Sequence, residues 1–336
     1  MAFKKKTKEE IKEEITQLTT DMHESIQSFS ESPEKLKELL DFMSQFHKYS
    51  FRNQALIKTQ FPGATCVGSF KAFSSLGFRI KKMDKTIGEK GIRIFKPREM
   101  LYYQKDNRWQ LVSKATKEDA QAIKTGQLQT KKVVDFVMTT VFDISMTNAS
   151  PEDVPELLPN KHENFANEGY LSEIYEALTS VGTKRDITIK LGAEFGLNIG
   201  LAKGMFINDK AGNKYIAMNP KNTESENVAV LIHELAHAEL HGNDSNSGKF
   251  ISVDKEEYQA EMAAYVVSKH FGISTEESSM RYIASWTENG NTLEDTTELL
   301  TEVSSFSKKL IDETTQELEH IMIYTNDQTL GVEKSM

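Results

Sequence analysis

The motif His233-Glu234-Leu235-Ala236-His237 constrains this chain more than any other feature of its sequence. On a helix, residues four apart lie on one face, so both imidazoles can reach one metal ion with Glu234 beside them. Zinc peptidases use this arrangement, with the two histidines as ligands and the glutamate as the general base towards water. The motif therefore predicts a helix that carries a metal centre.

The residues around the motif favour such a helix. Thr223 followed by Glu226 forms the pattern of a capping box, and the apolar run 228–232 leads directly into His233. Gly242 suits the end of a helix. We therefore expect the helix to begin near Thr223 and to end near Gly242.

A second helix is expected to complete the zinc site, because two histidines do not. Glu257 and Glu261 are four residues apart, which places both carboxylates on one helix face. We expect Glu257 to be the third ligand of one Zn²⁺ per chain, and Glu261 to orient a ligating histidine. Glu256 competes for the ligand role but lies one residue off that face, and His241 either ligates the metal or caps or lines the helix end.

Length and composition predict two soluble domains. At 336 residues the chain exceeds one typical domain, and 38% apolar and 27% charged residues are ordinary for a soluble protein. Cys66 is the only cysteine, so no intrachain disulfide can form, which fits a reducing compartment. The N-terminus is charged and no apolar run could span a bilayer. We therefore expect a cytoplasmic protein with no signal peptide and no membrane partner.

Charge divides the chain into two unlike parts. Residues 1–150 hold 26 Lys and Arg against 18 Asp and Glu, a net of +8, whereas residues 151–336 hold 15 against 32, a net of −17. Within residues 51–100, 11 basic residues accompany only 3 acidic ones. This asymmetry indicates a nucleic-acid-facing domain over 1–150 joined to an acidic domain over 151–336. Because the acidic domain carries the histidine motif, we expect it to be a zincin-like metallopeptidase domain.

Aromatic residues are interleaved with basic residues in the first domain. Single-stranded nucleic acid is bound by this combination, since cations follow the phosphates and rings stack on the bases. A β-rich domain with its phenylalanines in the core and its lysines on the surface would give the same composition. On the first interpretation the DNA-binding residues are Lys48, Tyr49, Phe51, Arg52, Asn53, Phe70, Lys71, Phe73, Arg79, Lys81, Lys82, Lys85, Lys90 and Arg93.

Hydrophobic periodicity and turn residues outline an α+β fold in two domains. Residues 7–47 are expected to form two helices that are separated at Ser32-Pro33, and residues 65–112 to form short strands and turns. Further expected elements are a loop or short helix at 116–125, a strand at 133–144, a linker at 146–167, a helix at 170–181, a small sheet over 185–219 with a turn at 209–213 and a last strand that borders the cleft, and an amphipathic helix at 292–322.

Several segments resemble ArdC-type plasmid antirestriction proteins. His233–His241 and Glu257–Ala264 resemble the metallopeptidase domain of that family, which is related to the ImmA/IrrE peptidases. Arg281–Trp286 resembles the C-terminal part of the same proteins. The segments that resemble the N-terminal domain are Tyr49–Ile57, Gln60–Thr65, Gly68–Phe70, Gly77–Lys82, Gly88–Ile92 and, at its end, Val141–Ser145.

The resemblance implies single-stranded DNA binding by the N-terminal domain and a role on a mobile element, such as protection of incoming DNA during conjugation. The C-terminal domain would then be a zinc metallopeptidase with a protein substrate. Two alternatives stay open. One is a regulatory endopeptidase of the ImmA type that cleaves a repressor, and the other is a non-catalytic, zinc-containing protein that shields DNA by occupying it.

Overall fold

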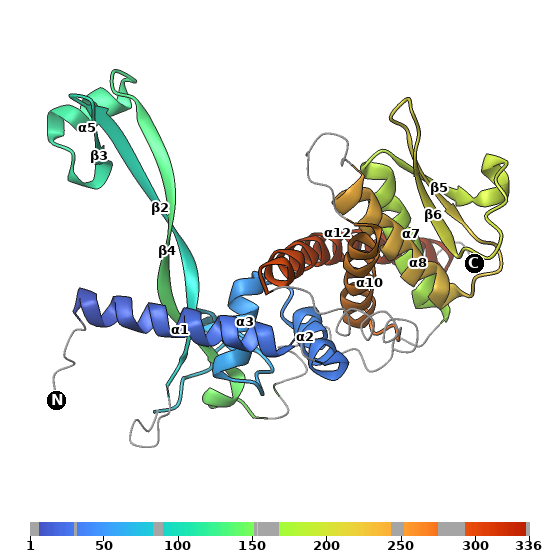
Figure 1. The fold of residues 1–336 in the computed structure, drawn as a ribbon, viewed down its shortest axis with the longest axis horizontal. Coiled ribbons are helices and arrows are strands. Elements are labelled where there is room, and N and C mark those ends of the chain that lie inside the picture. The colour runs from blue at the N-terminus through green and yellow to red at the C-terminus, as the bar shows by residue number, and fades with distance from the viewer. Residues whose placement is uncertain are drawn as a thin grey trace. The chain divides into compact units, whose positions relative to one another are not determined.

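The chain folds into two compact units, which share the helix α1 (Lys8–Phe29) (Figure 1). Unit 1 comprises residues 1–18 and 60–151, and unit 2 comprises residues 19–59 and 152–336. The computed structural model describes residues 7–29, 32–82, 90–150, 153, 168–242, 252–274 and 293–333. Both units combine helices with a sheet, so the α+β class that the sequence predicts is confirmed.

A long antiparallel ribbon dominates unit 1. Its two strands, β2 (Ile92–Lys105) and β4 (Thr130–Asp143), pair from Ile92↔Val141 to Tyr103↔Thr130 (Figure 1). The four-stranded sheet has the order β1-β4-β2-β3, with β1 (Val67–Ser69) and β3 (Arg108–Leu111) at its edges. Residues 65–112 therefore contain one strand far longer than the short strands that we expected, together with the short helix α4 (Phe70–Ser75).

A buried carboxylate organises each end of the ribbon. Asp143 accepts hydrogen bonds from the backbone N–H groups of Thr65 and Cys66, at 2.7 and 3.0 Å, and so holds the start of β1 against β4. At the far end, Asp119 lies on α5 (Lys117–Lys124) and accepts from the Tyr103 hydroxyl and the Lys105 ammonium. Both carboxylates are buried, so these bonds satisfy polar groups that would otherwise be costly.

Unit 2 is built from a three-stranded sheet and packed helices. The strand order is β5-β7-β6, with β5 (Ile187–Leu191) parallel and β6 (Gly204–Asn208) antiparallel to the central β7 (Lys214–Met218). A turn at 209–213 joins β6 to β7, and Asp209 accepts the N–H groups of Ala211 and Asn213 there, as the sequence predicts.

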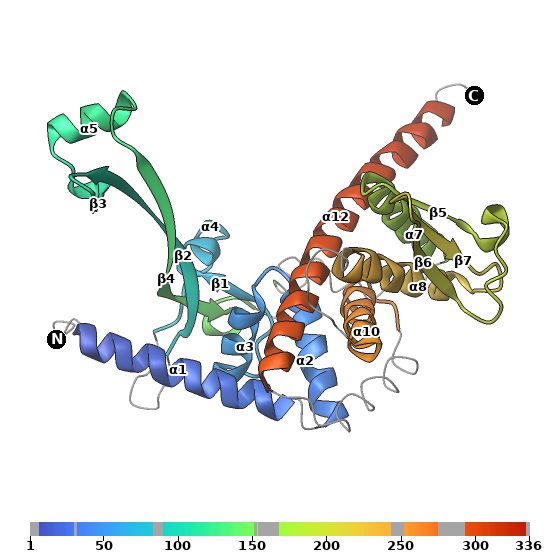
Figure 2. The same ribbon diagram turned by 45° about the horizontal axis from the view of Figure 1, so that its top comes forward.

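Four helices of the C-terminal part pack together, and the first two of them contact this sheet. They are α7 (Glu168–Lys184), α8 (Glu224–Ala236), α10 (Val253–His270) and α12 (Leu293–Glu333), and α10 packs against both α8 and α12 (Figure 2). The helices expected at 170–181 and 292–322 are thus present, with wider bounds. None of the helices in the described ranges combines the length and apolar character that crossing a membrane requires.

Residues 19–59 pack with the C-terminal helices, which differs from the expected boundary at residue 150. The helix α2 (Pro33–Gln45) lies against α10, and the Tyr265 hydroxyl donates to Asp41 at 2.7 Å. Gln54 of α3 (Phe51–Gln60) is buried and accepts from the Ser304 hydroxyl of α12 at 3.3 Å. A run of buried apolar side chains on α2 explains the packing, since these side chains need a partner surface: Leu36, Leu39, Leu40, Phe42 and Met43.

Other local expectations have mixed outcomes. The break between the first two helices is confirmed, and Ser32 caps α2 by accepting the N–H of Lys35. Residues 116–125 form a short helix, and 133–144 lie mostly in β4. Most of the expected linker at 146–167, together with Lys85 and the segment Arg281–Trp286, lies outside the described residues.

Candidate metal centre

The helix α8 presents the histidine motif as its sequence predicts. The capping box is formed, since the Thr223 hydroxyl accepts the N–H of Glu226 while the Glu226 carboxylate accepts the N–H of Thr223. After Ala236 the backbone changes to a π-helical turn over His237–His241, where a regular helix was expected. Gly242 permits this turn, because a Cβ there would lie 2.4 Å from the carbonyl oxygen of Ala238.

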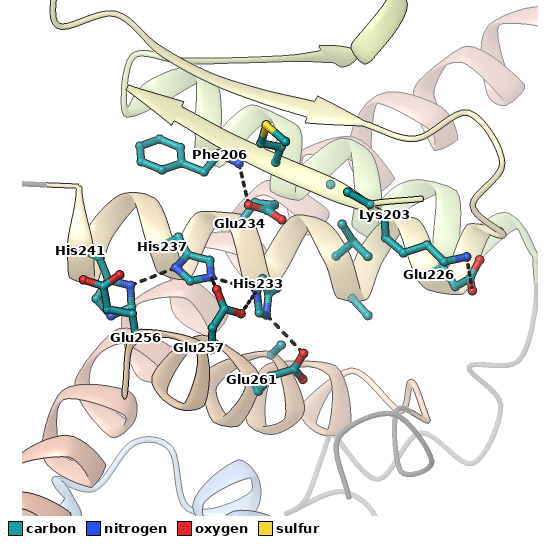
Figure 3. Close-up of a pocket in the computed structure, with 16 residues that line it drawn as sticks. Lys203, Phe206, Glu226, His233, Glu234, His237, His241, Glu256, Glu257 and Glu261 are labelled. Carbon is teal, nitrogen blue, oxygen red and sulfur yellow. Dashed lines mark hydrogen bonds and ion pairs between the residues drawn. The ribbon is translucent and has the colours of Figure 1, made fainter. Parts of the chain in front are cut away.

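Three side chains converge on one point between α8 and α10 (Figure 3). Their ligand atoms, on His233, His237 and Glu257, all lie within 4.8 Å of one another. The two Nε2 atoms are 2.9 Å apart, and each is 3.5 Å from an oxygen of Glu257. Ligands about 2.0–2.1 Å from a tetrahedral ion would lie about 3.3–3.4 Å apart, so the cluster fits a small divalent metal.

The neighbouring carboxylates take separate places. Glu257 belongs to the cluster, whereas Glu256 lines the surrounding pocket (Figure 3). Glu261 lies one turn along α10, with its Oε1 3.6 Å from Nδ1 of His233, on the side of the ring that faces away from the cluster. The contacts between histidines and carboxylates lower the pKa of Glu257 and raise the pKa of His233. The two histidines beside it hold the pKa of Glu257 well below its usual range.

The neighbouring carboxylates raise the pKa of His233. Burial alone would lower its pKa, but the carboxylates of Glu257 and Glu261 more than offset burial and raise it. Both motif histidines are largely buried, with side chains 17% and 15% exposed, whereas the Glu257 side chain is 43% exposed. The cluster is therefore closed on the α8 side and open on the side of Glu257.

Glu234 lies at the floor of a cavity of about 830 Å³ that α8, α10 and β6 line. Its Oε2 accepts the backbone N–H of Phe206 at 2.7 Å, which fixes the carboxylate against the edge strand (Figure 3). Gly204 allows this approach, because a Cβ there would lie 3.0 Å from Oε1 of Glu234. Burial raises the pKa of Glu234, while His233 and His237 oppose that shift.

The strand beside the cavity is β6, and not the last strand of the sheet as we expected. β7 lies in the middle of the sheet, so its backbone groups pair on both sides, whereas β6 forms an edge. Residues 203–206 line the cavity. Hydrophobic pattern alone does not reveal which of two paired strands is the edge.

His241 makes contacts that the sequence did not reveal. Its Nδ1 lies 3.1 Å from Nδ1 of His237, and its Nε2 lies 3.0 Å from Oε1 of Gln259. Gln259 is 1% exposed and donates from Nε2 to Glu302 of α12 at 2.5 Å. Gln259 lies between the two predicted glutamates of α10, but no sequence signal connects Glu302 with the site.

The predicted DNA-binding residues are divided between the two units. Residues 48–53 belong to unit 2, and the others to unit 1. Phe51 and Phe73 are each 2% exposed, so these two rings belong to the core and are not available to stack on bases as we predicted. Arg93 bonds to the Thr140 hydroxyl and pairs with Glu14. The exposed members in unit 1 are Phe70, Lys71, Arg79, Lys81, Lys82 and Lys90.

Comparison with known protein families assigns both parts of the chain. The model of the N-terminal domain of the anti-restriction factor ArdC matches residues 4–142, and the model of the IrrE N-terminal-like domain matches residues 190–299. The chain has the two-domain architecture of ArdC-type proteins. The IrrE-like match contains β6, α8 and α10, and therefore the whole cluster of His233, His237 and Glu257.

One curated protein and two crystal structures are similar to this chain. The uncharacterized protein pXO2-81 of Bacillus anthracis is 38% identical over 299 residues, which is 86% of this chain and 49% of that protein. The chain thus spans about half the length of this curated relative. Crystal structures of the antirestriction protein ArdC from plasmid R388, metal-free and Mn(II)-bound, are 17% identical, with TM-scores of 0.46 and 0.41, and cover about 80% of this chain and 85% of theirs.

Proposed function

We propose that this ArdC-type protein binds single-stranded DNA through unit 1 and hydrolyses peptide bonds at a zinc centre in unit 2. The observation that carries the peptidase part is the cluster of His233, His237 and Glu257 with Glu234 held beside it. Two imidazoles and one carboxylate are a ligand set of catalytic zinc, which leaves a coordination position open. Bound zinc would supply Lewis acidity that polarises a carbonyl and lowers the pKa of water.

Other residues of the protein then transfer the proton and orient the ligands. Glu234, whose pKa burial raises, takes a proton from water and passes it to the leaving amine. The Phe206 N–H holds one carboxylate oxygen, which leaves the other to face the cavity. Glu261 orients the His233 ring through Nδ1, so that Nε2 faces the cluster.

Loss of one carboxylate should test the peptidase assignment. With casein as probe and zinc present, mass spectrometry should find new peptide termini for the unaltered protein and not for Glu234→Gln. Glu256→Gln is the matched control, since Glu256 lines the same cavity outside the cluster. Cleavage that survives Glu234→Gln would contradict the role of Glu234 as the base.

The charge of unit 1 supports the DNA-binding part of the proposal. Residues 1–18 and 60–151 hold 21 basic and 12 acidic residues, a net of +9. Phe70 is 61% exposed beside the exposed Lys71, on the short helix α4. A cation next to an exposed ring can hold a phosphate while the ring stacks on a base.

Gel-shift titration with oligo(dT) should test this part. Reversing Lys81 and Lys82 to glutamate should weaken binding and flatten its salt dependence, because fewer counterions are released. Reversing Lys117 and Lys124, exposed on α5, changes the net charge equally and should have a smaller effect. Equal losses for both pairs would show that only net charge matters and would contradict a DNA site near Lys81. Stronger binding to duplex DNA would contradict the stacking argument.

An antirestriction role follows if the DNA-bound protein protects incoming DNA. Glu234→Gln also separates the alternatives of the ImmA type and of simple shielding. Protection that survives the substitution indicates shielding by occupancy, whereas loss of protection with DNA binding intact indicates that proteolysis is required. We propose the first of these outcomes, because the basic residues of unit 1 supply DNA affinity without the metal centre.

A further inference from the structure

A chain of hydrogen bonds leads from the metal cluster to the surface of α12. It runs from Nδ1 of His237 to Nδ1 of His241 (3.1 Å), from Nε2 of His241 to Oε1 of Gln259 (3.0 Å), and from Nε2 of Gln259 to Glu302 (2.5 Å). Figure 3 shows the first of these contacts as a dashed line from His237 to His241. The chain connects three separate elements, namely the end of the motif helix, α10 and α12.

The chemistry of the far end fixes the direction of every bond. An ionised carboxylate only accepts hydrogen bonds, so Gln259 donates its Nε2–H to Glu302 and presents Oε1 as an acceptor. His241 must then carry its proton on Nε2, and its Nδ1 becomes an acceptor. The only proton left for the contact between the two rings is the Nδ1–H of His237.

This direction matches what metal binding needs. A histidine ligand coordinates through one ring nitrogen and donates from the other, and the partner of the second nitrogen sets the tautomer. His237 with its proton on Nδ1 has a lone pair on Nε2, the atom that faces His233 and Glu257. The chain therefore selects the tautomer of His237 that can bind the ion.

We propose that His241, Gln259 and Glu302 are positioning residues that hold His237 in its metal-binding tautomer and orientation. The proposal rests on the metal site of the proposed function and assigns His241 a role outside the ligand set. Both ring nitrogens of His241 already face partners, Nδ1 towards His237 and Nε2 towards Gln259. His233 is served separately by Glu261, so the two motif histidines have different supports.

The local backbone and the burial of Gln259 favour these hydrogen bonds. The π-helical turn over His237–His241 shifts His241 from its regular helical position, and Gly242 makes the turn sterically feasible. Gln259 is a buried amide among the apolar residues of α10, where a polar group is costly unless it is bonded. Its contacts with His241 and Glu302 use one acceptor and one donor of the amide, which is the pattern that a directional relay requires.

Exchanging the side chains of Gln259 and Glu302 tests the direction of the hydrogen bonds. Gln259→Leu should weaken Zn²⁺ affinity by about 10–100-fold in competition with a chelator, which is the usual effect of removing a residue that supports a ligand. Gln259→Glu alone places two carboxylates together and should also weaken it. The exchange Gln259→Glu with Glu302→Gln restores an acceptor for His241 and a donor between the two side chains, so affinity should recover.

Nitrogen-15 spectra of the histidine rings give a readout that does not need the metal. In the metal-free protein at pH 8, His237 should carry its proton on Nδ1 and His241 on Nε2, and Gln259→Leu should mix the tautomers of both rings. Glu319→Gln, an exposed change further along α12, is the control and should leave spectra and affinity unaltered. Circular dichroism confirms that each variant is folded.

Two results would overturn the proposal. One is a Gln259→Leu protein that keeps both the affinity and the tautomers, and the other is an exchanged pair that binds zinc no better than Gln259→Glu alone. If Gln259→Leu does not fold, the comparison of Gln259→Glu with the exchanged pair decides. If the unaltered protein binds no zinc while the tautomers are as expected, the proposed metal function is wrong. The hydrogen bonds from His237 to Glu302 and the tautomers that they select are then still confirmed.

Discussion

Acid should destabilise this protein through one buried histidine. His47 follows α2 and is 5% exposed, and its ring lies edge-on to His270 at 4.5 Å between centroids. Burial lowers the pKa of His47 from its ordinary 6.5 to about 4, and the neighbouring His270 and Lys48 act in the same direction. Asp312 of α12, 3.8 Å from Nε2, opposes the shift without reversing it.

The sign and size of the effect follow from these values. Between pH 6.5 and 4 the unfolded chain binds a proton at His47 that the folded chain does not, so the free energy of unfolding falls as the pH falls. Each pKa unit is worth about 1.4 kcal/mol, so the loss reaches about 3 kcal/mol below pH 4. Above pH 6.5 both states are neutral at this residue, and stability is unaffected by it.

Urea unfolding of the metal-free protein from pH 7.5 to 4 measures this contribution. Other groups titrate in the same range, so the informative quantity is the difference between the unaltered protein and His47→Gln. That difference should shrink by about 3 kcal/mol from pH 7.5 to 4. His23→Gln, an exposed histidine on α1, is the control and should run parallel to the unaltered protein. A His47→Gln curve that is also parallel would refute the reasoning.

Three further predictions concern packing and the edge strand. A fragment of residues 152–336 lacks the buried apolar face of α2. It should therefore bind a hydrophobic dye and unfold at a lower urea concentration than a fragment of residues 19–336. Equal stability of the two fragments would contradict the division into units. Gly242→Ala should destabilise the protein by about 1–3 kcal/mol in urea unfolding, since its Cβ would lie 2.4 Å from the Ala238 carbonyl oxygen; an unchanged midpoint would show that the π-helical turn relaxes freely. Phe206→Pro removes the N–H that holds Glu234 and should raise the pKa of that carboxyl further. The pH below which peptidase activity is lost should therefore be higher than in the unaltered protein. Met205→Pro is the control, and an equal shift in that variant would indicate strand distortion instead.

The sequence could indicate the residues of the cluster because the two histidines lie close together on one helix and the two glutamates on another. The need of a zinc site for a third ligand then indicated that the two helices meet. The spacing of His233 and His237 fixes them on one helix face, and the capping box sets where that helix begins. The pair Glu257 and Glu261 follows the same rule on α10, and the structure places them near different atoms of the cluster. Side chains that lie three or four residues apart can be placed without knowledge of the tertiary fold.

The parts that the sequence did not predict depend on contacts between distant segments. Gln54 and Asp41 lie in the basic N-terminal half, yet they bond to Ser304 and Tyr265 more than 220 residues later. Composition suggested that Phe51 and Phe73 were stacking platforms, but burial is a property of the folded chain and not of its charge pattern. The link from Gln259 to Glu302 is invisible for the same reason, because it joins two helices.

Metal content in two neighbouring variants tests the central claim most directly. Glu256 and Glu257 are adjacent on α10 and differ in that only Glu257 belongs to the cluster with the two histidines. After equilibration with Zn²⁺ and desalting, elemental analysis should find about one zinc per chain in the unaltered protein and in Glu256→Gln. Glu257→Gln should lose most of it. Retention of zinc in Glu257→Gln together with its loss in Glu256→Gln would contradict the assignment of the metal centre.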